Sequence, residues 1–502
     1  MNSSSELKIY APSLYWFCYH LHQGLVVEIE MDNQADSQVE PEPPIDLAWV
    51  ETEYQRIFKA FNLKCPLDLV NPQSPQGYNL LKSHYPTKPA QKRKRQQNFT
   101  TSDGLKGFIY PQVINDTYAL NLRIAFPEKY GEDEYLCKDL SRLNPENCFQ
   151  GNRYSREEFL GQTLLLTIYL NQPCPVNPRD LDEPAKNCWL AFFKLKDEAD
   201  FPRLYRVSPC CNGYLYEFGN PRETLAQNPY GHLVVWFMFD SSTTKILNKF
   251  YWSLPEFFLY RHKISKNFRK SRYFYYKADR IVQRNETSLN QLNQSYLKRE
   301  EITLLTEEAL QVFKNQLKTL LKLSLSYSQQ LRNLEYAHNT IAINQKNYLA
   351  ILDQMEQLAQ MPLGGLRVFG EKEAVAFQDQ ITADLNYFRH GSGLLDTAIA
   401  SIRGLVEIDQ AERDRLLQDQ NQTLQDNIQS IGVGIAVGAI IASTSGLVLQ
   451  YQPMTFPWED NYGDRLHPFV IAIAVSFAFS WIAWRGMKCL LTRKRRQDKK
   501  LT

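Results

Sequence analysis

IQSIGVGIAVGAIIASTSGLVLQY (Ile428–Tyr451) carries no charged side chain, and neither does FVIAIAVSFAFSWIAW (Phe469–Trp484). Each is close to the roughly 20 apolar residues that a helix needs to cross a bilayer core of ~30 Å. The segment between them is too short for a domain. We therefore predict a transmembrane helical hairpin inserted in a lipid bilayer, with two buried helices of a soluble domain as the alternative.

Charged residues around the hairpin predict its orientation. The loop before the second stretch has Arg465 against Glu459, Asp460 and Asp464. Basic residues gather after that stretch: Arg485, Lys488, Arg493, Lys494, Arg495, Arg496, Lys499 and Lys500. Because basic flanks stay in the cytoplasm, we predict a two-pass protein of the plasma (inner) membrane with both termini cytoplasmic.

Small residues recur every four positions in the first stretch, at Gly434, Gly438, Ala442 and Gly446. Such a ladder lets helix backbones approach closely in lipid, either inside one hairpin or between copies around an axis. Packing between copies would create a pore. Its lining candidates are Asn427, Ser430, Gly434, Gly438, Ser443 and Thr444. Glu459, Asp460 and Asp464 would then form an acidic ring that concentrates cations at the outer mouth.

Length and composition set wider limits. The 502 residues leave room for about three domains. The net charge of +2 gives no general attraction to nucleic acid or anionic lipid. Nine cysteines occur without a CxxC pair, which favours free thiols in the cytoplasm. The N-terminus lacks the pattern of a signal peptide.

Residues 1–244 are typical of a cytoplasmic α/β domain. Leu47–Leu63 has apolar residues at helical spacing, and Leu7–Leu21 is rich in β-formers but interrupted by Pro12. Further strand candidates are Leu25–Met31, Phe108–Ile114, Tyr118–Phe126, Leu160–Leu170, Trp189–Leu195, Leu204–Val207, Leu215–Phe218 and Leu233–Phe239. No P-loop, GxGxxG, GxSxG or HExxH motif occurs there, so we expect no enzyme. The dispersed histidines, such as His20 and His232, are expected to be packing or surface residues.

Residues 245–427 have a helical period and are predicted to form a long stalk. Ile302–Met361 reads as one helix, ended by Pro362-Leu363-Gly364-Gly365. A second helix begins near Glu371, with a potential interruption at Gly391–Gly393. From Leu394 to Tyr451 we predict one helix of about 85 Å. Its carboxylates Glu407, Asp409 and Glu412 form either a solvated face or a divalent-cation site for Mg²⁺ or a similar ion.

A basic and aromatic segment precedes this stalk. Arg261–Arg284 has nine Lys or Arg residues against one Asp, with interleaved Phe and Tyr side chains. Such a mixture suits a nucleotide or another phosphorylated ligand. A helix with aromatics inside and charges in water, or a membrane-surface contact, would also explain it. For the first alternative, the anion-binding candidates are Lys266, Arg269, Lys270 and Arg272.

The order of these parts resembles the CorA family of divalent-cation channels, best over Ile302–Lys500. The resemblance implies a homo-oligomer, specifically a funnel-shaped pentamer, with the first span lining the pore and cytoplasmic cation sites controlling it. The family signature at the outer end of the first span is Tyr-Gly-Met-Asn. This chain has Tyr451-Gln452-Pro453-Met454 there, so only the aromatic residue matches. Divergent CorA-like proteins accompany type III CRISPR and related defence systems, where a nucleotide second messenger is thought to trigger them.

Together, these patterns predict an α+β protein in four parts: a cytoplasmic α/β domain (1–244), a long-helix stalk (245–427), a transmembrane hairpin (428–486) and a basic cytoplasmic tail (487–502). The function expected is an ion pore gated by the cytoplasmic domain, in the form of a nucleotide-triggered antiviral defence effector. The alternatives are a divalent-cation transporter of the Mg²⁺ type and a membrane-anchored scaffold without a pore.

Overall fold

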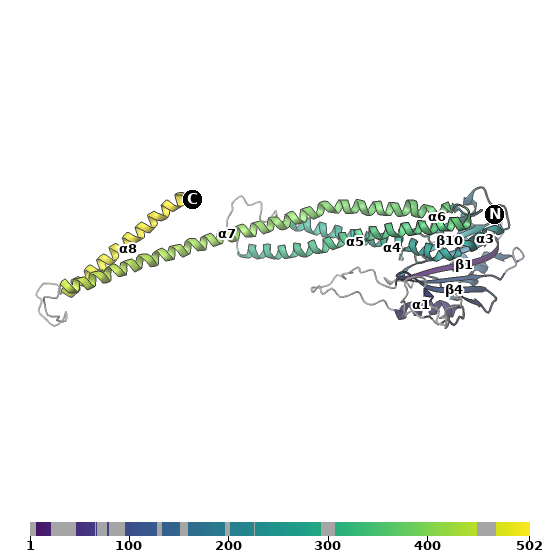
Figure 1. Ribbon diagram of the computed structural model, residues 1–502, viewed down its shortest axis with the longest axis horizontal. Coiled ribbons are helices and arrows are strands. Elements are labelled where there is room, and N and C mark those ends of the chain that lie inside the picture. The colour runs from purple at the N-terminus through teal and green to yellow at the C-terminus, as the bar shows by residue number, and fades with distance from the viewer. Residues whose placement is uncertain are drawn as a thin grey trace. The chain divides into compact units, whose positions relative to one another are not determined.

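The computed structural model describes residues 7–21, 47–65, 67, 78–79, 96–127, 133–150, 159–195, 201–224, 226–292, 307–448 and 468–501. The chain divides into two compact units. The first comprises Met1–Ser288 and Lys322–Leu394, and the second comprises Leu289–Leu321 and Leu395–Thr502. The first unit holds a ten-stranded sheet (Figure 1). An N-terminal sheet domain, a long helical region and a C-terminal apolar helix are therefore confirmed.

The sheet is mixed, with the order β2-β4-β5-β1-β7-β10-β9-β8, while β3 pairs with β4 and β6 with β1. The strands are β1 (Lys8–Leu21), β2 (Tyr78–Asn79), β3 (Gln97–Thr100), β4 (Lys106–Ile114), β5 (Thr117–Ala125), β6 (Tyr135–Leu136), β7 (Phe159–Tyr169), β8 (Leu204–Pro209), β9 (Gly213–Phe218) and β10 (His232–Met238). β7 and β10 are parallel, and the other pairs of described strands are antiparallel. The predicted strands from Phe108–Ile114 to Leu233–Phe239 are confirmed, except for Trp189–Leu195. The predicted strand Leu25–Met31 lies outside the described residues.

The helices are α1 (Leu47–Ala60), α2 (Asp182–Phe192), α3 (Ser241–Phe250), α4 (Leu254–Leu292), α5 (Glu307–Ala359), α6 (Gly364–Val368), α7 (Ala374–Val448) and α8 (Pro468–Leu501). A π-helical turn, Phe369–Glu373, joins α6 to α7. The helix predicted at Leu47–Leu63 is confirmed. The predicted helix break at Pro362–Gly365 is also confirmed, because α5 ends at Ala359 and α6 begins at Gly364.

Strand β1 shows how helices cover both faces of the sheet, because successive side chains of a strand point to opposite faces. Trp16 belongs to the core shared with α1 and α2, and its ring lies 5.1 Å from that of Phe149. On the other face, the Phe17 ring lies 5.2 Å from Phe258 of α4. The hydroxyl of Tyr19 donates a hydrogen bond of 2.7 Å to the carbonyl of Pro255. α4 is therefore held directly against the centre of the sheet.

Pro12 lies inside β1 and does not interrupt the strand, contrary to the expectation from the sequence. The register between β1 and β7 shifts between Tyr10 and Ser13, and Ala11 has a positive φ of 45°. Such a bulge accommodates a residue that lacks a backbone N–H without ending the strand.

The prediction of a strand at Trp189–Leu195 is wrong, because Asp182–Phe192 forms helix α2. Its aromatic side chains suggested β structure, but the residues buried on one helical face are three, one and three positions apart: Ala185, Cys188, Trp189 and Phe192. Helical spacing thus outweighs the β preference of single aromatic residues here.

Helix α7 is longer than predicted. It runs without a break from Ala374 to Val448, a total of 75 residues, and passes through Gly391–Gly393. In the first unit the hydroxyl of Tyr327 in α5 donates a 2.6 Å hydrogen bond to the carbonyl of Phe388. The predicted boundaries after residues 244, 427 and 486 all fall inside continuous helices, namely α3, α7 and α8. They mark changes of composition along these helices.

Candidate functional site

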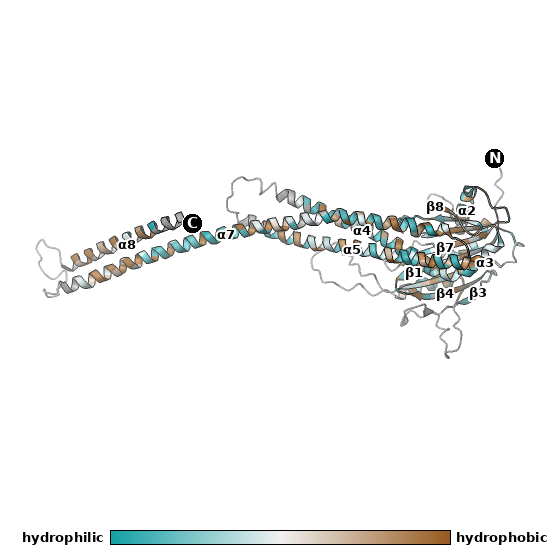
Figure 2. Ribbon diagram, turned by 45° about the horizontal axis from the view of Figure 1, so that its top comes forward, coloured by the Kyte–Doolittle hydropathy of each residue, from teal (hydrophilic) through white to brown (hydrophobic). Residues whose placement is uncertain are grey.

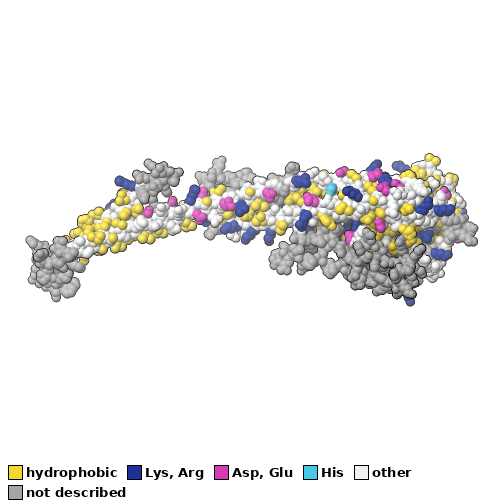
Figure 3. All heavy atoms as spheres, in the orientation of Figure 1, with side chains coloured by type: hydrophobic (Ala, Val, Ile, Leu, Met, Phe, Trp, Pro, Cys, Tyr) yellow, Lys and Arg dark blue, Asp and Glu magenta, His cyan; other side chains and the backbone are white. Residues whose placement is uncertain are grey.

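Two described helical segments are long and apolar enough to cross a membrane: Asp396–Thr444 within α7 and Val470–Arg493 within α8. Only 17% of the most apolar window of the first is buried, and none of that of the second. A core helix of a soluble protein would bury its apolar side chains. Figure 2 shows hydrophobic residues along the last part of α7 and along α8, and hydrophobic side chains dominate the same segment in Figure 3.

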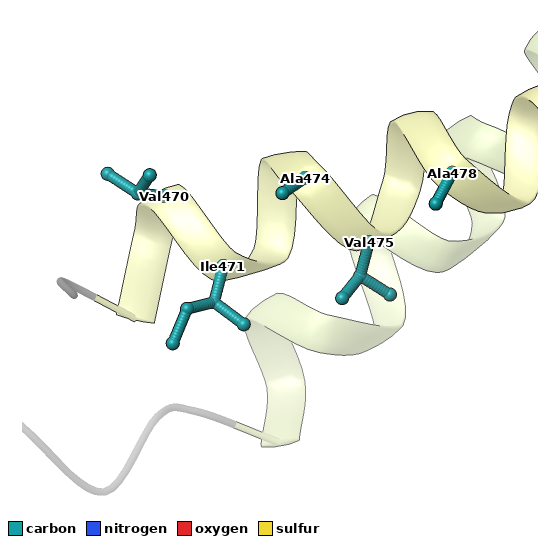
Figure 4. Close-up of a pocket in the computed structure, with 5 residues that line it drawn as sticks. All are labelled: Val470, Ile471, Ala474, Val475 and Ala478. Atoms are coloured by element: carbon teal, nitrogen blue, oxygen red, sulfur yellow. The ribbon is translucent and has the colours of Figure 1, made fainter. Parts of the chain in front are cut away.

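An apolar hollow of about 370 Å³ lies on α8. Its lining residues, shown in Figure 4, are Val470, Ile471, Ala474, Val475 and Ala478. All are hydrophobic, as expected for a helix surface that contacts lipid acyl chains or another apolar helix.

The glycine ladder of α7 packs against α8 of the same chain. A Cβ atom added to Gly434 would lie 3.1 Å from the carbonyl oxygen of Ser480 and from Cβ of Trp484. One added to Gly438 would lie 1.9 Å from Oγ of Ser480. Ser430, one turn earlier, is fully buried. Gly434 and Gly438 therefore belong to the contact inside the hairpin, and Ser430 lies on the same stripe of α7.

The other pore-lining candidates are more exposed. Ser443 and Thr444 are exposed, and each hydroxyl donates to a carbonyl one turn back, at 2.6 Å to Ala439 and 2.8 Å to Ile440. Asn427 is half-buried. The predicted acidic ring of Glu459, Asp460 and Asp464 lies outside the described residues.

The three stalk carboxylates differ in environment. Glu407 is exposed and pairs with Arg403 at 3.2 Å, Glu412 is half-buried, and Asp409 is buried with Arg413 at 2.9 Å. Within the described part of the chain, no group of three or more His, Cys, Asp or Glu side chains is placed to hold a metal ion. A divalent-cation site at these residues therefore stays a prediction that concerns contacts between copies.

The four anion-binding candidates of α4 have different surroundings. Nζ of Lys266 is buried and donates to the carbonyl of Phe159 at 3.1 Å. Nη1 of Arg269 donates to the carbonyl of Pro221 at 3.0 Å. Arg272 pairs with the buried carboxylate of Asp384 in α7, and Lys270 is half-buried. Lys266, Arg269 and Arg272 thus take part in contacts of α4 with the sheet domain and α7.

Glu217 of β9 is the centre of a buried ionic cluster. Its carboxylate lies 3.2 Å from Nε2 of His232, 3.6 Å from Nη2 of Arg261 and 3.9 Å from Nη1 of Arg206. Burial alone would raise the pKa of Glu217. The hydrogen bond from His232 and the charges around the carboxylate outweigh burial and lower the pKa to about 2. Glu217 is therefore ionised at neutral pH.

A chain of hydrogen bonds extends from Glu217 to His262. Oγ1 of Thr163 lies 3.1 Å from Nδ1 of His232 and 2.8 Å from Nε2 of His262. Because Glu217 is an acceptor, Nε2 of His232 donates to it, and Nδ1 accepts the one hydroxyl proton of Thr163. Nε2 of His262 then donates to Thr163, which leaves Nδ1 of His262 as an acceptor. Burial lowers the pKa of His232 to about 4 and that of His262 well below its usual value, so both rings are neutral.

The same helix α4 packs on the beginning of α7. The rings of Phe268 and Phe377 are stacked with centroids 3.9 Å apart, and Arg272 pairs with Asp384 one to two turns further on. The π-helical turn before α7 reaches the ionic cluster. Its Glu373 lies 3.1 Å from Nη2 of Arg206, and its Phe369 ring lies 4.7 Å from the guanidinium of Arg261.

Sequence reasoning missed Arg206, Glu217 and the role of Arg261. The available signal was a charged residue inside a short apolar strand, as with Glu217 in GYLYEF (213–218) and Arg206 in LYRVSP (204–209). His232 was expected to be a packing or surface residue, and it is a buried member of this cluster.

Comparison with known proteins adds no family to this geometry: no family model matches the chain, and no curated protein is significantly similar to it.

Proposed function

We propose that the protein is an oligomeric membrane pore of the CorA-like type, gated by its cytoplasmic sheet-bearing unit. The observation that carries this proposal is the continuity of α7 over 75 residues. One helix bears Phe377 and Asp384, which contact α4, and also the apolar stretch that contacts α8. Because a packed helix moves as a rigid element, a shift at its first turns can reach its apolar end.

The faces of α7 support an axis beside the contact with α8. At about 100° per residue, the stripe of Ser430, Gly434 and Gly438 lies about a quarter turn around the helix from a second stripe that the described chain leaves exposed. This stripe consists of Leu424, Ile428, Ile431 and Ile435, each at least half exposed. Their spacing of three and four residues is that of a coiled-coil seam. We therefore assign the seam to contacts between copies around the axis.

The proposed location is the inner membrane, with two spans and both termini in the cytoplasm. It is supported by the two apolar helices and by the basic residues after Trp484. As gating ligand we propose a nucleotide second messenger for a defence effector, or Mg²⁺ for the transporter alternative.

The test is the mass of the full-length protein in detergent, measured by light scattering, followed by ion flux in liposomes. We expect a ring of at least four copies, five by resemblance to CorA, and ligand-dependent flux. The double variant Leu424→Gln/Ile428→Gln should dissociate the ring. Leu416→Gln, an exposed position about a quarter turn of the helix away from the seam, should leave the ring intact.

Other results would select the alternatives. A monomer or dimer in several detergents would leave too few first spans for a channel and would favour a membrane-anchored scaffold. Flux that needs no nucleotide and discriminates among divalent cations would favour the transporter.

A further inference from the structure

A small cavity lies between the first turns of α4 and the central strands of the sheet. Its volume is about 40 Å³, and its lining includes Arg261, His262, Ser265 and Arg269 of α4 together with Gly161 of β7. Since one water needs about 10–15 Å³ of such space, the cavity has room for about three oxygen atoms. Its other wall contains Asn220 and Glu223, which are half-buried.

Arg269 is a half-buried cation that forms no ion pair with a carboxylate among the described residues. Its one hydrogen bond there goes to the neutral carbonyl of Pro221, at 3.0 Å. Burial and the charge of Arg261 lower the pKa of Arg269 to about 10. A guanidinium that is partly withdrawn from water is costly unless an anion compensates it. Among the described residues Glu223 lines the same cavity but forms no ion pair with Arg269, so the arrangement favours an anion from outside.

Arg261 has unused hydrogen-bonding capacity in the same cavity. It is 3% exposed, and its Nη2 makes no hydrogen bond in the described structure. Its ion pair with Glu217 is long, at 3.6 Å, and that carboxylate is shared with Arg206 and His232. In the described structure, Nη2 of Arg261 therefore lacks a hydrogen-bond acceptor, and the charge of Arg269 lacks a carboxylate partner.

Two further groups determine which anion fits. Nδ1 of His262 is an acceptor, as derived above, and it faces Gly161: a Cβ atom there would lie 2.4 Å from it. An acceptor beside two guanidinium groups suits an anion that also carries a hydroxyl, such as a monohydrogen phosphate. The carboxylate of Glu223 at the wall accepts the backbone N–H of Asn220 at 3.2 Å. An anion that carries a hydroxyl can donate a hydrogen bond to this carboxylate, whereas a fully deprotonated anion cannot.

We propose that this cavity binds a phosphoryl group through Arg261 and Arg269, either as inorganic phosphate or as the terminal phosphate of a larger ligand. The space for about three oxygens matches the three terminal oxygens of that group, and arginine pairs suit its geometry. The site lies wholly in the first unit and does not rest on the proposed pore. Of the four anion-binding candidates predicted from the sequence, only Arg269 lines this cavity.

The experiment is equilibrium dialysis of the full-length protein in detergent against radiolabelled inorganic phosphate, with methyl phosphate and sulfate as competitors. We expect one saturable site per chain, competition by methyl phosphate, and weaker competition by sulfate. Arg269→Met should weaken phosphate binding at least tenfold, and Arg269→Lys, which keeps the charge, should weaken it less. The control Arg280→Met changes an exposed arginine of the same helix and should bind as the wild type does.

Thermal unfolding without phosphate gives an independent readout. Removal of an uncompensated, half-buried charge should leave Arg269→Met at least as stable as the wild type. If Arg269 instead serves to hold Pro221, the same substitution should lower the melting temperature. Tighter binding of methyl phosphate than of phosphate would identify the terminus of a larger ligand. Absence of saturable phosphate binding by the folded wild type, or equal binding by Arg269→Met, would overturn the proposal. Because these results do not depend on the oligomer mass or on ion flux, failure of this proposal can be told apart from failure of the proposed pore.

Discussion

Replacing Glu217 by Gln tests whether the buried ionic cluster holds α4 to the sheet. The substitution keeps the size and one acceptor for His232, but it removes the charge shared with Arg206 and Arg261. The pKa of the carboxyl falls from its ordinary 4.5 to about 2. At about 1.4 kcal/mol per pKa unit, this corresponds to about 3 kcal/mol of the free energy of unfolding. Breaking a buried ion pair from one side typically costs a similar amount, about 3–5 kcal/mol.

The pH dependence of this loss has a definite sign. Because the pKa of Glu217 is lower in the folded state, its contribution is fully present above pH 4.5 and is lost as the pH falls through about 2. The Gln side chain does not titrate. The deficit of Glu217→Gln relative to wild type should therefore be constant at neutral pH and shrink to less than about half at pH 3.

The assay is thermal unfolding of the full-length protein in detergent, followed by tryptophan fluorescence, since Trp16, Trp189 and Trp236 are buried in the sheet domain. We expect a melting temperature about 6 °C lower for Glu217→Gln at pH 7. The control Glu371→Gln removes an exposed partner of Arg367 and should cost about 0–1 kcal/mol. A drop below about 2 °C at pH 7, or a deficit at pH 3 as large as that at pH 7, would refute the reasoning.

Two further substitutions examine the contacts of α7. Gly434→Ile should separate α7 from α8, because its Cβ would meet Ser480 and Trp484, and limited proteolysis should cut the hairpin faster; Gly432→Ile, where nothing lies within 4 Å of the added Cβ, should be cut at the wild-type rate. Arg272→Met should lower the free energy of unfolding by about 3–5 kcal/mol, because Asp384 would stay buried without its partner. The double variant Arg272→Met/Asp384→Leu should recover most of that loss in a thermal double-mutant cycle, and strictly additive effects would contradict a direct pair.

The sheet was predictable where its strands are buried on both faces. Leu160–Leu170 and Leu233–Phe239 are almost continuously apolar, and they form β7 and β10, the parallel pair at the centre of the sheet. Such strands read as apolar runs because helices cover both sides. The break between α5 and α6 was equally clear, because Pro362 cannot continue a helix, and Gly364 and Gly365 then begin α6.

The ionic cluster was not predictable, for a physical reason. Arg206, Glu217 and His232 come from three strands, Arg261 comes from α4, and Glu373 comes from the π-helical turn. No local spacing relates them, and the pairing of β8, β9 and β10 alone brings the first three together. From sequence, the charges of the basic helix segment were assigned to water or to a ligand. In the structure Arg261 pairs with Glu217 of β9, and Arg272 pairs with Asp384 of α7.

The position of the phosphoryl cavity next to the start of α7 has a consequence for regulation. An anion between Arg261 and Arg269 competes with Glu217 and with the Phe369 ring for the guanidinium of Arg261. Phe369 and Glu373 belong to the turn that begins α7, so binding and the arrangement of this turn are linked. Linkage is reciprocal: a ligand shifts the turn only by the ratio of its affinities for the two arrangements. If phosphate opens the proposed pore, its affinity must be higher in the open state by the factor by which it raises the open-to-closed equilibrium constant. Phosphate binding by Arg272→Met, which loses a contact between α4 and α7, and by the wild type should then differ, and equal affinities would separate the cavity from gating.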